Sequence, residues 1–69
     1  MFHTKILSLE NEVIKKFGFE HQTTTNVFRI TANAKQAYEE GLVDTAFDFI
    51  KQAQDELEIA ELRRNRGFE

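Results

Sequence analysis

The sequence predicts an all-α fold: a three-helix domain in which an antiparallel helical hairpin, formed by the second and third helices, packs on the first helix. The chain has 69 residues, which is enough for one small domain. It has no proline, so its three glycines are the main breaks along it. Between those glycines, apolar residues recur every three or four positions, which is the period of an α-helix.

The first helix is expected over residues 2–17. Two lysines stand in its last turn, where the helix dipole favours positive charge. Gly18 follows and predicts a left-handed C-cap. The apolar stripe that faces the core consists of Phe2, Ile6, Leu9, Val13 and Phe17.

The second helix is expected over residues 26–40. Thr25 or Asn26 would cap its start and Gly41 would end it. Residues 17–31 are rich in β-branched and aromatic side chains, however, and such side chains favour strands. A short β-hairpin is therefore an open alternative to a loop followed by the start of this helix.

The third helix is expected over residues 44–65, with Asp44 as its N-cap and residues 66–69 as a tail. Its apolar stripe consists of Leu42, Ala46, Phe49, Ile50, Ala53, Leu57 and Ala60. The link to the second helix spans only Gly41 to about Val43, and a link that short makes the two helices antiparallel neighbours.

The two facing stripes are rich in alanine, which allows the helices to approach closely. Along the two helices, small, aromatic and large apolar residues follow one another in this order: Ala34, Ala37, Tyr38, Gly41, Ala46, Ile50 and Ala53. This run resembles one tetratricopeptide repeat over about half of the chain, and the resemblance implies an antiparallel helical hairpin. The first helix is expected to lie across that hairpin, on a surface made by Phe28, Phe49, Ile50 and Leu57.

Composition narrows the function by exclusion. Without cysteine the chain has no disulfide, no thiolate zinc site and no cysteine nucleophile. His3 and His21 lack a metal-binding spacing and are expected to face solvent, and Ser8 lacks a glycine elbow. We therefore expect no enzyme, no metal and no cofactor. The absence of a signal peptide and of a long apolar run predicts a cytoplasmic protein that does not enter membranes.

Several apolar side chains do not fit a single core. Ile59 and Leu62 fall on the side of the third helix opposite its apolar stripe, Phe47 falls at the edge of that stripe, and Phe68 follows Gly67. These four residues form the candidate interaction patch. They predict a small regulatory or adaptor protein that binds itself, as a homodimer, or another protein, because small chains gain burial by associating.

The alternative is a small helical DNA-binding regulator of the helix-turn-helix type, which has a similar size and fold class. Arg63, Arg64 and Arg66 are the candidate basic contacts for a phosphate backbone. Residues 39–61 oppose this alternative, because they carry eight acidic side chains and only Lys51 as a base. Acidic side chains on an exposed helix face repel phosphates.

Overall fold

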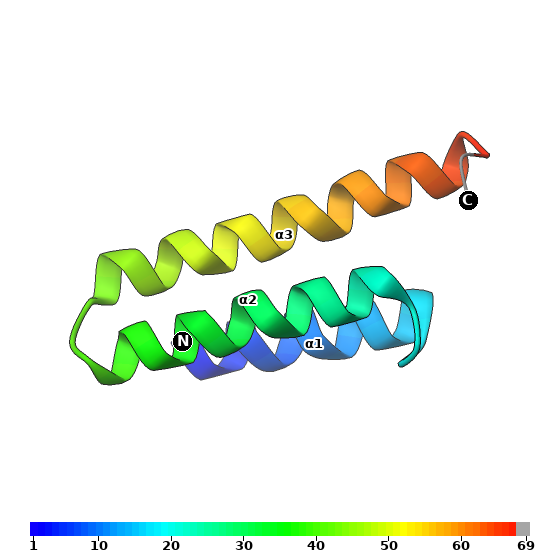
Figure 1. The fold of residues 1–69 in the computed structure, drawn as a ribbon. Helices are drawn as coiled ribbons and strands as arrows, with labels where there is room; N and C mark the ends of the chain where they lie inside the picture. Colours follow the sequence, from blue (N-terminus) through cyan, green and yellow to red (C-terminus); the bar gives the residue numbers. More distant parts are fainter. Residues whose placement is uncertain (68–69) are drawn as a thin grey trace.

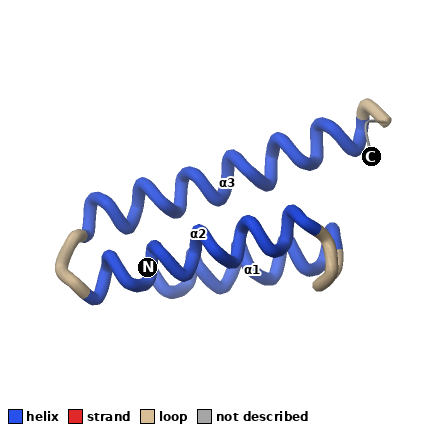
Figure 2. The backbone as a smooth tube through the Cα atoms, in the orientation of Figure 1, coloured by secondary structure: helices blue, strands red, loops and turns tan. Residues whose placement is uncertain are grey.

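Three α-helices follow one another along the chain: α1 (Phe2–Phe17), α2 (Gln22–Glu39) and α3 (Val43–Asn65). The computed structural model describes residues 1–67, and no strand occurs among them (Figure 2). In Figure 1, α2 and α3 run antiparallel and α1 lies alongside α2. The predicted all-α fold, with an antiparallel hairpin packed on the first helix, is confirmed.

Alanines line the seam between α2 and α3, which is the largest interface between helices of this fold. Ala34, Ala46 and Ala53 are fully buried, and Ala37 and Ala60 are nearly so. Small side chains at a helix contact let the two axes come close, because they leave no bulk between the backbones. The tight hairpin predicted from the alanine pattern is therefore the centre of the structure.

A Schellman motif joins α2 to α3. The Leu42 N–H donates to the Ala37 carbonyl at 2.9 Å, and the Gly41 N–H donates to the Tyr38 carbonyl at 3.1 Å. Gly41 has a φ of 84°, which a residue with a Cβ adopts only at a cost. As predicted, Gly41 ends the second helix, and the turn that it forms reverses the chain (Figure 1).

The core lies where α1 meets the hairpin. From α1 it takes Phe2, Ile6, Leu9 and Val13, and from the hairpin it takes chiefly Val27, Ile50 and Leu57. Phe49 packs at its edge, as expected. Phe28 was expected to join it but remains 36% exposed. That prediction was wrong because two buried threonines, Thr24 and Thr31, occupy this side of α2 in its place.

The second helix begins at Gln22, four residues earlier than predicted. His21 caps it, rather than Thr25 or Asn26: its Nδ1 accepts the Thr23 N–H at 3.0 Å. The Thr24 hydroxyl donates to the Gly18 carbonyl at 2.5 Å, which ties this first turn to the end of α1. These two bonds satisfy the Thr23 N–H and the Thr24 hydroxyl within the first turn of a helix. Residues 22–31 are helical and residues 17–31 contain no strand, so the β-hairpin alternative is wrong.

Two further predicted caps were wrong in detail. Gly18 has a φ of 85° but an extended ψ of 173°, so it is not a left-handed helical cap, although its N–H still bonds the Ile14 carbonyl at 2.8 Å. The N-cap of α3 is Leu42, and Asp44 lies in the first turn instead. An acid there still complements the helix dipole. The α3 helix ends at Asn65, as expected.

Candidate functional site

An exposed apolar pair lies near the C-terminal end of α3. Ile59 is 47% exposed and Leu62 is 48% exposed, and the two stand one helical turn apart. The neighbouring residues Leu57 and Ala60 are buried, so Leu62 lies on the side of α3 that faces away from the bundle, and Ile59 lies between that side and α2. The structure thus leaves both residues exposed, as the sequence predicted.

Exposed charges border this pair in a fixed order along α3. Asp55 and Glu58 precede it, and Arg63 and Arg66 follow it. Each charge lies three or four positions from one of the apolar residues, so all of them flank the pair on one region of the helix. We define the α3 outer face as Asp55, Glu58, Ile59, Leu62, Arg63 and Arg66.

Phe47 belongs to a different part of the molecule. Its ring meets that of buried Phe2 edge to face, with 5.6 Å between centroids. Phe2 also stacks on Tyr38 at 4.2 Å, which makes an aromatic cluster at the N-terminal end of α3. Phe47 and Ile59 are twelve residues apart, about 18 Å along the helix. The structure therefore does not bring Phe47 together with Ile59 and Leu62, and Phe68 lies outside the described residues.

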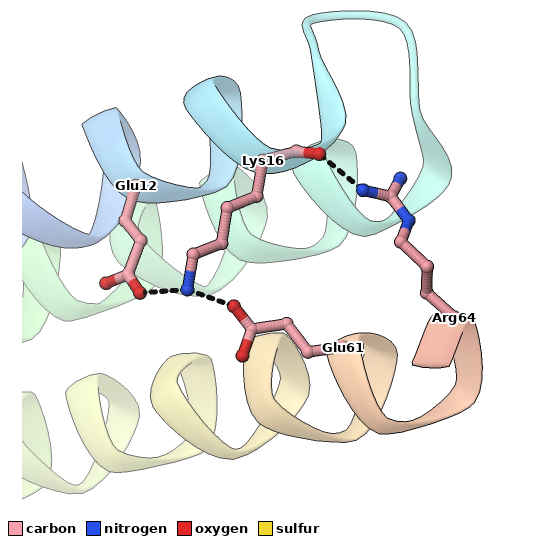
Figure 3. A network of polar contacts seen from close by, with 4 residues as sticks. All are labelled: Glu12, Lys16, Glu61 and Arg64. Atoms are coloured by element: carbon pink, nitrogen blue, oxygen red, sulfur yellow. Dashed lines mark hydrogen bonds and ion pairs between the residues drawn. The ribbon is translucent and has the colours of Figure 1, made fainter. Parts of the chain in front are cut away.

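Arg64 contacts α1, which sets it apart from the other two candidate basic residues (Figure 3). Its Nη1 donates to the Lys16 carbonyl at 2.5 Å. Its guanidinium also lies 4.0 Å above the centroid of the Phe17 ring, which is a cation–π contact. Arg64 follows Leu57 and Ala60 at helical spacing, so the inward stripe continues through it. The apolar pattern missed Arg64, but the same period could have found it.

Lys16 links α1 to α3 through two carboxylates. Its Nζ donates to Glu12 at 2.8 Å and also to Glu61 of α3 (Figure 3). The hydrogen bonds to Glu12 and Glu61 raise the pKa of Lys16 above its ordinary value of 10.5. A raised pKa means that the folded state holds the proton more tightly, so these contacts are complete at neutral pH. As the pH rises through that raised pKa, Lys16 loses its proton and this contribution to stability is lost.

Arg64→Ala is expected to lower the free energy of unfolding by about 1–2 kcal/mol, because it removes both the bond to Lys16 and the contact with Phe17. Urea denaturation followed by circular dichroism measures this change. Lys51→Ala, at an exposed basic residue of α3 outside the α3 outer face defined above, is the control, and it should change stability by no more than about 0.5 kcal/mol. Equal losses in the two variants would contradict the anchoring role of Arg64.

Neither histidine lies in a metal-binding group, since residues 1–67 contain no cluster of three or more histidine, aspartate or glutamate side chains placed to hold a metal. His3 is exposed, as expected. His21 was expected to face solvent but is half-buried, because it caps α2 and packs against Phe17 with 4.7 Å between ring centroids.

Two of the hollows that border α3 lie close to the site residues. One, of about 400 Å³, is between α1 and α3, and its lining mixes Lys5 with Glu12, Glu58 and Glu61. The other, of about 220 Å³, lies between the start of α2 and the α3 residues Ile59 and Arg63. The second hollow therefore extends the α3 outer face towards α2.

Within residues 1–67, none of the helices is long and apolar enough to cross a lipid bilayer. No family model, curated protein or solved structure matches this chain. The antiparallel helical hairpin that the resemblance to a tetratricopeptide repeat implied is present as α2 and α3.

Proposed function

We propose that this protein is a small, non-enzymatic regulatory or adaptor protein of the cytoplasm that acts through protein–protein contacts and associates with itself. The observation that carries the proposal is the pair Ile59 and Leu62, which are adjacent on α3 and each about half exposed. Adjacent apolar side chains on an exposed helix face gain free energy when a partner covers them.

Size gives a second reason. A chain of 69 residues buries a smaller share of its surface than a larger domain does, so association offers it burial that its own fold lacks. The core accommodates four apolar residues of α1 and leaves Ile59 and Leu62 unused. These residues are therefore available to a partner without any change in the fold.

Analytical ultracentrifugation tests self-association directly. At high micromolar concentration we expect a species of twice the 8.1 kDa of one chain. Leu62→Asp should return the protein to a monomer, because it places a charge in the middle of the apolar contact. Leu7→Asp is the matched control: Leu7 is 58% exposed but lies on α1, and this variant should remain a dimer.

Two results would contradict the proposal. One is a wild-type monomer at high micromolar concentration. The other is a dimer that is equally stable in Leu62→Asp, which would place the contact elsewhere on the molecule. Circular dichroism of each variant would establish that it remains helical.

The DNA-binding alternative has less support. Arg64 is exposed but already binds Lys16 and Phe17, so Arg63 and Arg66 are the candidate basic contacts more readily available to a phosphate backbone. Asp55 and Glu58 lie beside them on α3 and would repel phosphates. A retardation assay at low salt distinguishes the two functions: tight binding to arbitrary DNA would favour the alternative, and no binding would remove it.

A further inference from the structure

We infer that the occupant of the α3 outer face is a second copy of this chain, packed antiparallel about a two-fold axis midway between Ile59 and Leu62. This inference rests on the proposed self-association and adds to it the orientation of the two copies. It follows from the order of charges on the α3 outer face, which reads acidic, apolar and basic along the helix.

Two copies of the α3 outer face have complementary charges only when the two α3 helices run antiparallel. If two copies packed in parallel and in register, Asp55 and Glu58 of one copy would face the same acids of the other. The basic residues Arg63 and Arg66 would likewise face each other. Like charges across an interface disfavour that arrangement. If one copy is reversed, the basic turn of each lies over the acidic turn of the other.

The spacing of Asp55 and Arg66 fits the reversed arrangement. The two residues are eleven positions apart, which is close to three full helical turns, so they project from nearly the same line along α3. They also lie at equal distances, about 8 Å, on either side of the midpoint between Ile59 and Leu62. A two-fold axis at that midpoint therefore places Asp55 of each copy opposite Arg66 of the other.

The apolar pair lies at the centre of the same arrangement. Ile59 and Leu62 flank the line that joins Asp55 to Arg66, one on each side. Reversal about the two-fold axis sets Ile59 level with Leu62 of the second copy, and Leu62 level with Ile59, so the four side chains meet around the axis. The result is a small apolar centre closed at both ends by an Asp55–Arg66 ion pair, which is the isologous pattern typical of homodimers.

Charge exchange tests this orientation. Asp55→Arg and Arg66→Asp should each weaken the dimer about tenfold, because each places like charges together at two symmetric positions. The double variant Asp55→Arg/Arg66→Asp restores opposite charges and should return the dissociation constant to within about twofold of wild type. Sedimentation equilibrium over a concentration series measures all four proteins, and circular dichroism checks that each is helical.

Asp48→Arg is the matched control. Asp48 is exposed and projects from nearly the same line of α3, but the two-fold axis places no residue of the second copy's α3 opposite it. The same charge change there should alter the dissociation constant by less than about twofold.

The possible failures are distinguishable. A wild-type monomer would overturn self-association and the orientation together. A wild-type dimer that is lost in Leu62→Asp, but in which the double variant is weaker than either single variant, would overturn only the antiparallel orientation. Single variants that associate as strongly as wild type would also overturn it.

Discussion

Ile6→Ala is expected to lower the free energy of unfolding by about 2–5 kcal/mol. Ile6 is only 1% exposed and lies in the middle of the α1 stripe that packs on the hairpin. Truncation removes apolar surface from the core and leaves a cavity that the neighbouring helices fill only in part. In a domain of this size the melting temperature should fall by about 8 °C or more.

The adjacent residue supplies the control. Leu7 has the same number of side-chain atoms but is 58% exposed, so Leu7→Ala should change stability by no more than about 0.5 kcal/mol. Thermal and urea denaturation of the two variants at one protein concentration measure the difference. Similar losses at the two positions would mean that α1 does not pack on the hairpin through the stripe containing Ile6.

Ala34→Leu is expected to destabilise the protein by about 1–3 kcal/mol, although it adds apolar surface. Ala34 is fully buried in the seam between α2 and α3, where the close approach of the helices leaves no room for a longer side chain. The added atoms must push the helices apart or adopt strained rotamers. Urea denaturation followed by circular dichroism measures the loss.

Ala32→Leu is the matched control for this substitution. Ala32 lies on the same helix, two residues away, and is exposed. Alanine and leucine have similar helix propensities, so the change at residue 32 should be within about 0.5 kcal/mol. If Ala34→Leu were equally harmless, the α2–α3 seam would be looser than its buried alanines indicate.

Periodicity and glycine positions predicted most of the fold. The predicted stripes contain every buried residue of α1 and α3, because a helix that packs on one side must repeat its apolar residues at the helical period. They also included Leu42, which is 51% exposed, and Phe17 and Phe49, which are only partly buried. The start of α2 was harder. Its first turn depends on the bond from Thr24 to Gly18 and on the cap by His21, and neither contact follows from the intrinsic preferences of threonine and histidine.

The candidate site could be predicted only in part. Ile59 and Leu62 were found because their helical positions fall opposite the buried stripe. The role of Arg64 could not be predicted, because the charge of an arginine suggests a contact with phosphate or solvent. In the structure its guanidinium lies on the ring of Phe17 in another helix. Phe47 was grouped with distant residues because exposure was inferred without the contact that it makes with Phe2.

The alanine seam between α2 and α3 also affects the order in which the helices detach during unfolding. The contacts between α2 and α3 join neighbouring segments across a three-residue turn, whereas α1 shares smaller interfaces with both. The larger interface should hold α2 and α3 together after α1 has detached, because local opening begins where the fewest contacts must be broken. Amide hydrogens of α1 should therefore exchange with solvent before those at the centre of the hairpin. Release of α1 would uncover Val27, Ile50 and Leu57, so the hairpin alone is the state of this chain most prone to aggregate.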